Sequence, residues 1–225
     1  MRDFLITIMP AAMWILTLLN LLLTIALFVE WRKKKAILPL LMGLVAFGLF
    51  YDALILSAGT VLKEGWLLKN LSLMRFVLHC GLIPLLFPIC AMALGLSKTA
   101  LKAVWIVTGV IIAVGVAAGF ATGLAPQALG NVIRYTSQKE ITPAWSTGIQ
   151  NALSYGPIVI LMVCGIIVLI RSRRPELFLS GLSMFVFSAL APATHNMDLM
   201  FFISMFGEVL MVLFFLLYER KRKAG

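Results

Sequence analysis

The stretch LSLMRFVLHC, residues 71–80, places an arginine and a histidine in a run that is otherwise suited to lipid. Across the chain, 62% of the 225 residues are hydrophobic and only 12% are charged, whereas soluble domains are about 45–50% apolar and about 25% charged. A soluble fold of this length could not bury so much apolar surface. The sequence therefore predicts a membrane protein in which Arg75 and His79 need an explanation of their own.

Seven apolar stretches are long enough to cross a bilayer, since a helix needs about 20 residues to span the hydrocarbon core. The stretches lack the ten-residue alternation of membrane-barrel strands, so they are predicted to be helices. The predicted spans are residues 4–29, 36–57, 72–96, 103–123, 147–170, 177–193 and 197–218. We therefore expect an all-α, seven-transmembrane helix bundle that forms one polytopic domain over residues 1–225.

The basic residues behind the net charge of +10 cluster beside the apolar stretches, which is typical of membrane topology and not of nucleic-acid binding. On the side of the C-terminus lie thirteen of them: Arg32, Lys33, Lys34, Lys35, Lys98, Lys102, Arg171, Arg173, Arg174, Arg220, Lys221, Arg222 and Lys223. On the other side lie five: Arg2, Lys63, Lys69, Arg134 and Lys139. The positive-inside rule then predicts a multi-pass cell-membrane protein with its N-terminus outside and its C-terminus in the cytoplasm.

Smaller signals predict local features of the bundle. Pro84 and Pro88 should kink the third span. Gly115, Gly119 and Gly123 recur every four residues in the fourth span, which predicts a face for close helix packing. The connections 58–71 and 124–146 mix apolar and polar residues. They are expected either to lie at the membrane interface or to fold over the bundle as a lid.

Polar side chains gather in the outer halves of four predicted spans. In order along the chain they are Tyr51, Asp52, Ser72, Arg75, His79, Gln150, Asn151, Ser154, Tyr155, His195, Asn196 and Asp198, with Glu208 nearer the middle of its span. A charge inside a membrane helix costs about 2.5–3.5 kcal/mol on insertion scales, and such groups usually face a cavity or the bundle interior. We therefore predict one shared polar pocket that opens toward the outside.

Several of these residues also have purely structural explanations. In this interpretation, Asp52 and Arg75 form a buried ion pair between two helices, and His79 is a core histidine. His195 is then a loop residue, and Asp198 caps a helix. Glu208 is the hardest to explain in this way, because a lone carboxylate near the middle of the bilayer needs a partner or a proton.

The predicted pocket would bind an amphiphilic or lipid-like substrate, and metal-assisted hydrolysis is one possible use of it. Zinc bound by two histidines and a carboxylate lowers the pKa of its water to about 7 and supplies a nucleophile. The candidate zinc ligands are His79, His195 and Asp198. The candidate catalytic residues are His79, Asp52 and Glu208. The candidate substrate-binding residues are Arg75, which suits an anionic head group, Tyr51, Asn151 and Tyr155.

Other uses of the same residues are open. In a proton- or cation-coupled transporter or channel, the acidic residues and His79 would form the pathway, although polar residues become sparse in the inner half. A receptor or sensor would bind a small ligand in the outer pocket. His79 and His195 could also bind a haem iron. The expected partners are membrane lipids and a small amphiphilic molecule, and the oligomeric state is not predicted.

Overall fold

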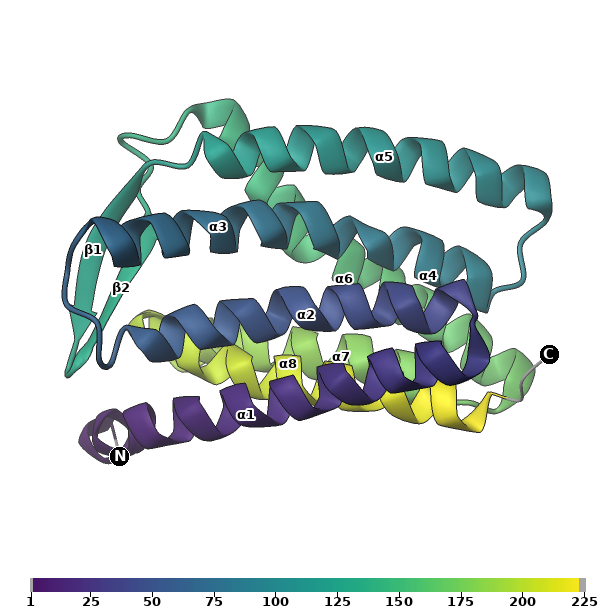
Figure 1. Cartoon of the computed structure of the whole chain (residues 1–225), viewed down its shortest axis with the longest axis horizontal. Coiled ribbons are helices and arrows are strands. Elements are labelled where there is room, and N and C mark those ends of the chain that lie inside the picture. Colours follow the sequence, from purple (N-terminus) through teal and green to yellow (C-terminus); the bar gives the residue numbers. More distant parts are fainter. Residues whose placement is uncertain (1, 223–225) are drawn as a thin grey trace.

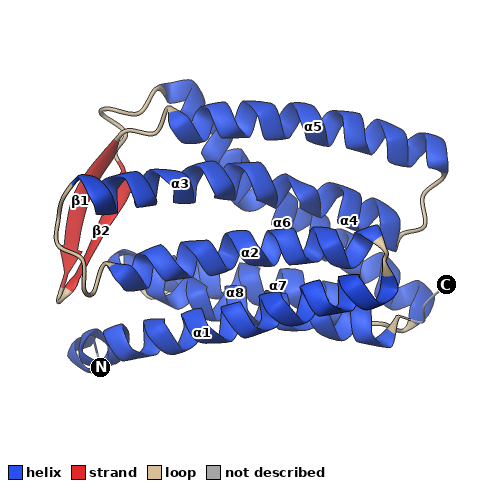
Figure 2. Cartoon of the chain, viewed as in Figure 1, coloured by secondary structure: helices blue, strands red, loops and turns tan. Residues whose placement is uncertain are grey.

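The computed structural model describes residues 2–222 and confirms the all-α fold with seven helices able to span a membrane (Figure 2). Lys223, which was counted for the topology, lies outside the described residues. The helices are α1 (Arg2–Lys34), α2 (Ile37–Ala58), α3 (Trp66–Leu82), α4 (Leu86–Ala93), α5 (Lys98–Phe120), α6 (Ala144–Ser172), α7 (Glu176–Ala193) and α8 (Met200–Lys221). A 3-10 turn, Ile83–Leu85, joins α3 to α4 within the third span, and a second, Met197–Leu199, precedes α8.

The helices run side by side along the long axis of the molecule (Figure 1). Their contacts close them into a ring. In the ring, α1 packs on α2, α2 on α3, α3 on α5, α5 on α6, α6 on α7, and α7 on α8, which returns to α1. The ring has two ends. The hairpin end carries two short strands, and the charged end carries the turns α1–α2, α4–α5 and α6–α7 together with the C-terminus (Figure 1).

The break between α3 and α4 determines which residues occupy the centre of this ring. Proline lacks an N–H and clashes with the preceding turn, so Pro84 and Pro88 interrupt the helix as predicted. Beyond the break, α4 packs against α2, α5 and α6. Leu86 and Ile89 are fully buried there, in one core with Phe215 of α8. The centre is therefore solid at the charged end, up to the level of the 3-10 turn.

Helix α5 lies close against α3, as the glycine spacing predicts. A side-chain carbon placed on Gly119 would lie 2.6 Å from the Cα of Val77, and one on Gly115 would lie 2.5 Å from the backbone oxygen of Cys80. Only glycine allows an approach this close, so the predicted packing face is confirmed for Gly115 and Gly119. Gly123 lies beyond the end of α5, and a side-chain carbon there would lie 2.5 Å from the backbone oxygen of Ile141.

The connection after α5 contains a β-hairpin that the sequence analysis did not predict. Strands β1 (Leu124–Leu129) and β2 (Val132–Ser137) pair in antiparallel fashion around a two-residue turn, where Gly130 has a φ of 56°. The hairpin lies across the end of the bundle (Figure 1). The N–H of Ile133 donates to the backbone oxygen of Gly59 at 2.8 Å, and the hydroxyl of Tyr135 donates to that of Gly65 at 3.3 Å. The segment therefore covers the bundle end.

Candidate functional site

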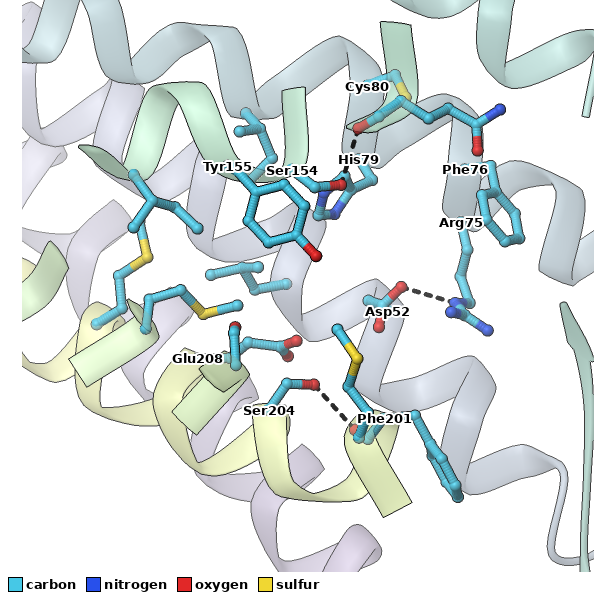
Figure 3. Close-up of a pocket in the computed structure, with 18 of the residues that line it drawn as sticks. Asp52, Arg75, Phe76, His79, Cys80, Ser154, Tyr155, Phe201, Ser204 and Glu208 are labelled. Atoms are coloured by element: carbon cyan, nitrogen blue, oxygen red, sulfur yellow. Dashed lines mark hydrogen bonds and ion pairs between the residues drawn. The ribbon is translucent and has the colours of Figure 1, made fainter. Parts of the chain in front are cut away.

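The main cavity lies inside the ring in the half near the hairpin, where no helix fills the centre. Its volume is about 380 Å³, and α2, α3, α6, α7 and α8 all contribute to its wall (Figure 3). Ile83 and Leu86, at the break of the third span, are among its lining residues. The polar and titratable lining residues are Asp52, Arg75, His79, Gln150, Asn151, Ser154, Tyr155, Ser188, Ser204 and Glu208.

An ion pair joins α2 to α3 at one side of the cavity. The Nε of Arg75 donates to Oδ1 of Asp52 at 2.6 Å, and both side chains are mostly buried. The guanidinium also lies 5.4 Å from the ring centre of Phe76. The ion pair expected from the structural interpretation of Asp52 and Arg75 is therefore present. The same two residues also line the cavity, as the functional interpretation predicted.

Glu208 of α8 points into the same cavity (Figure 3). Its side chain is 5% exposed, and its Oε2 has no hydrogen-bond partner among the described residues. Ser204, one turn earlier on α8, donates to the backbone oxygen of Phe201 at 3.1 Å. Among the side chains that the structure describes, residues 4–222, Glu208 has no cation within ion-pair distance, so its carboxylate is available to whatever occupies the cavity.

Helix α6 forms a polar wall with a side opening. The amide nitrogen of Gln150 donates to Thr122 at 3.0 Å and to Ser146 at 2.8 Å, which fixes this side chain to the end of α5. The hydroxyl of Ser154 donates to the backbone oxygen of Gln150 at 2.8 Å. Tyr155 lines the cavity and is nevertheless 56% exposed. The cavity therefore reaches the outer surface of the bundle at Tyr155.

The hairpin contributes a second arginine just above the cavity. The guanidinium of Arg134 stacks 4.1 Å from the ring centre of Phe201, a lining residue, and donates to Gln127 at 2.6 Å. The pKa of Arg134 is lowered to about 10, mainly by burial and also by the charge of Arg75, while Asp198 acts in the opposite direction. Arg134 stays charged at neutral pH and ties the hairpin to the first turn of α8.

The structure gathers most of the predicted site residues. Those that line the cavity are Asp52, Arg75, His79, Asn151, Tyr155 and Glu208. Tyr51 does not line it, because its hydroxyl donates to the backbone oxygen of Leu71 at 3.2 Å. The sequence analysis missed the apolar part of the wall, including Met184, Met211 and Phe201. In a chain this rich in apolar residues, no sequence signal separates a cavity-lining methionine from one that faces lipid.

The predicted zinc ligands are not brought together. His79 lines the cavity, but His195 is exposed in the turn that ends α7, where it has a φ of 55°. Asp198 lies in the 3-10 turn before α8 and does not line the cavity either. Across residues 2–222, no three His, Cys, Asp or Glu side chains are grouped so that they could hold a metal ion. The sequence analysis assumed that the last helix begins near His195, whereas α8 begins at Met200.

The sequence matches no protein-family model, and a comparison with curated proteins found no match. The fold and the cavity define the class of protein: a seven-helix, multi-pass membrane protein with a polar cavity in one half of its bundle.

Proposed function

We propose that this protein binds a small amphiphilic molecule in the cavity at the hairpin end. The proposal rests on one observation: the wall of a single cavity is partly charged and partly apolar, and the cavity opens to the side of the bundle. Asp52, Arg75 and Glu208 supply charge, while Leu49, Ile158 and several methionines supply apolar surface. Ligand sites in proteins combine a largely apolar surface with a few polar groups, in volumes of about 300–1,000 Å³. The cavity falls within that range.

The opening at Tyr155 supports a ligand that arrives from the membrane. Tyr155 is the twelfth residue of α6, which places it about 16 Å along the helix from Ala144 at 1.5 Å per residue. That depth lies within the apolar part of a bilayer about 30 Å thick. A molecule with an apolar tail can reach the cavity there without crossing the hairpin, whereas a fully polar solute cannot.

Binding fits the structure better than conduction along the whole bundle. The lining ends at Met211 and Leu86, and beyond it the centre is occupied by the buried core around Phe215 and Ile89. Nor do we extend the proposal to hydrolysis. The predicted zinc ligands lie apart, and the carboxylate of Asp52 is held by Arg75.

We also propose that the hairpin end faces the outside of the cell membrane. The support is the distribution of basic residues, which are concentrated at the charged end. The bound molecule would then be taken from the outer half of the bilayer, as expected for a receptor or a carrier of an amphiphile.

Probe binding to the purified protein in lipid nanodiscs tests the proposal. Three probes share a six-carbon chain and differ in charge: hexyl glucoside, hexyl sulfate and hexyltrimethylammonium. We expect at least one to raise the midpoint of thermal unfolding. Ser188→Phe, which fills the cavity from α7, should abolish that shift. Val186→Phe, on the same helix but on an exposed position outside the cavity, is the matched control and should retain it.

The proposal is wrong if none of the three probes shifts the wild-type midpoint. It is also wrong if the shift is equal in Ser188→Phe and Val186→Phe, because the probes would then be acting on the lipid-facing surface.

A further inference from the structure

The charges around the cavity do not balance. Arg75 and Asp52 neutralise each other at 2.6 Å. Glu208 has no ion pair among the described residues, and its Oε2 has no hydrogen-bond donor. A charged carboxylate that is buried without a partner is costly, so such groups are normally paired, bound to a cation or protonated. The ionised cavity thus lacks one positive charge.

The two basic residues of the wall, Arg75 and His79, form no ion pair with Glu208, and Arg75 is paired with Asp52. Gln150 and Ser154 already donate to protein groups, and the Ser204 hydroxyl donates to its own helix. Arg134 of the hairpin is stacked on Phe201 and bonded to Gln127. Glu208 can therefore be neutralised in two ways, by a proton or by a cation that enters the cavity from outside the chain.

We infer that the cavity selects a cationic amphiphile, an alkylammonium-type molecule whose charged group binds Glu208. The inference rests on the proposed function and names the charge of the ligand. It also revises the role predicted for Arg75, which was expected to bind an anionic head group. Because its Nε donates to Asp52, Arg75 forms part of the cavity wall and connects α3 to α2.

The surroundings of Glu208 suit an organic cation better than a small hydrated one. Tyr155 points into the same space (Figure 3), and aromatic rings attract ammonium groups through their negative faces. Met184 and Met211 add soft, polarisable surface. A metal ion would need several oxygen ligands at once, whereas an ammonium group with an apolar tail needs one carboxylate and apolar walls.

The test compares matched probes and matched variants in nanodiscs. For wild type we expect tighter binding of hexyltrimethylammonium than of hexyl glucoside, and the weakest binding of hexyl sulfate. In Glu208→Gln, which keeps the side-chain shape, affinity for the cation should fall about tenfold or more, the effect expected for one buried charge partner. Affinity for hexyl glucoside should stay within about twofold. Glu140→Gln, an exposed glutamate after the hairpin, should change neither.

The inference is overturned if wild type prefers the neutral or anionic probe, or if Glu208→Gln leaves the affinity for the cation unchanged. In both cases the proposed function still stands if hexyl glucoside binds to wild type and Ser188→Phe removes that binding. If no probe binds wild type, the proposed function itself has failed. If Glu208→Gln loses hexyl glucoside as well, its cavity has collapsed. Glu208→Asp, which retains the charge, then decides: it must keep the preference for the cation over hexyl glucoside.

Discussion

Both ends of the bundle contain buried carboxylates, but the two ends differ in whether each carboxylate is paired with a cation. At the charged end, Lys221 lies 2.8 Å from Glu176, and Arg222 lies 3.1 Å from Glu219. Lys34 lies 3.5 Å from Glu219 and also contacts its backbone oxygen. At the hairpin end, one carboxylate is paired with Arg75, whereas Glu208 faces a cavity. The first arrangement is complete without a ligand and the second is not.

This difference separates a structural role from a binding role. The ion pairs of the charged end connect α1, α7 and α8, and none of their residues lines the cavity at the hairpin end. A carboxylate with a close cation needs nothing further, and removing one member of such a pair leaves a buried charge behind. Removing Glu208 leaves no cation behind. Substitutions of Glu219 and of Glu208 should therefore have opposite consequences for stability and for binding.

The largest effect on stability is expected from Glu219→Gln. Glu219 is fully buried, and its neutralisation removes the carboxylate that pairs with Lys34 and Arg222, although Lys34 keeps Glu30 at 4.0 Å. Breaking a buried pair costs about 3–5 kcal/mol. Because Arg222 is partly exposed and can turn toward water, we expect a loss of about 3 kcal/mol in the free energy of unfolding in mixed micelles. Glu140→Gln is the control. Equal stability of the two variants would show that the charged end is not held by these pairs.

The next effect concerns the ion pair in the cavity wall. Arg75→Gln and Asp52→Asn should each lower the free energy of unfolding by about 2–3 kcal/mol, because each leaves one mostly buried charge alone. The double variant should lose less than the sum of the two, with a coupling of about 1–3 kcal/mol. Additive losses in the double-mutant cycle would contradict the contact between α2 and α3.

A smaller effect is expected at the hairpin. Arg134→Gln removes the stacking on Phe201, a contact worth about 0.5–2 kcal/mol. The hairpin should open more often, so amide hydrogens of β2 should exchange faster with solvent, while those of α4 should not change. Arg134→Lys keeps the charge but not the planar stacking surface, and it should show an intermediate rate. Unchanged exchange in Arg134→Gln would mean that Arg134 does not fasten the hairpin.

The smallest effect on stability is expected from Glu208→Gln. The substitution leaves no cation unpaired and removes a buried carboxylate that lacks a donor, so the free energy of unfolding should stay within about 1 kcal/mol of wild type or rise. A loss as large as that of Glu219→Gln would reveal a protein partner for Glu208. The contrast between the two ends would then disappear.

The helices were predictable from the sequence because apolar runs of about 20 residues have few alternatives in a membrane. The break at Pro84 and the glycine face of α5 followed from backbone chemistry alone. The hairpin was missed although its signal is present. The pair Gly130–Asn131 separates two short segments, and such two-residue turns are typical of hairpins.

Most of the polar cavity residues were predictable because ionisable groups in membrane helices seldom face lipid. The ion pairs of the charged end were not. Glu30, Glu176 and Glu219 lie on three helices far apart in the sequence, and only the closure of the ring brings α1, α7 and α8 together. The predicted contact of His195 with His79 failed for a related reason. It depended on where α8 begins, and the turn before it places that start at Met200.

Photolabelling with a neutral probe tests the central claim most directly. A hexyl glucoside that carries a diazirine on its chain would be activated in nanodiscs containing the protein, and the labelled residues identified by mass spectrometry. The account predicts labels on α6 near Tyr155 and on α8 between Met200 and Met211, removed by excess hexyl glucoside and by Ser188→Phe. Labels spread over lipid-facing positions such as Val107 and Ile170, and unaffected by competitor, would contradict a ligand site inside the bundle.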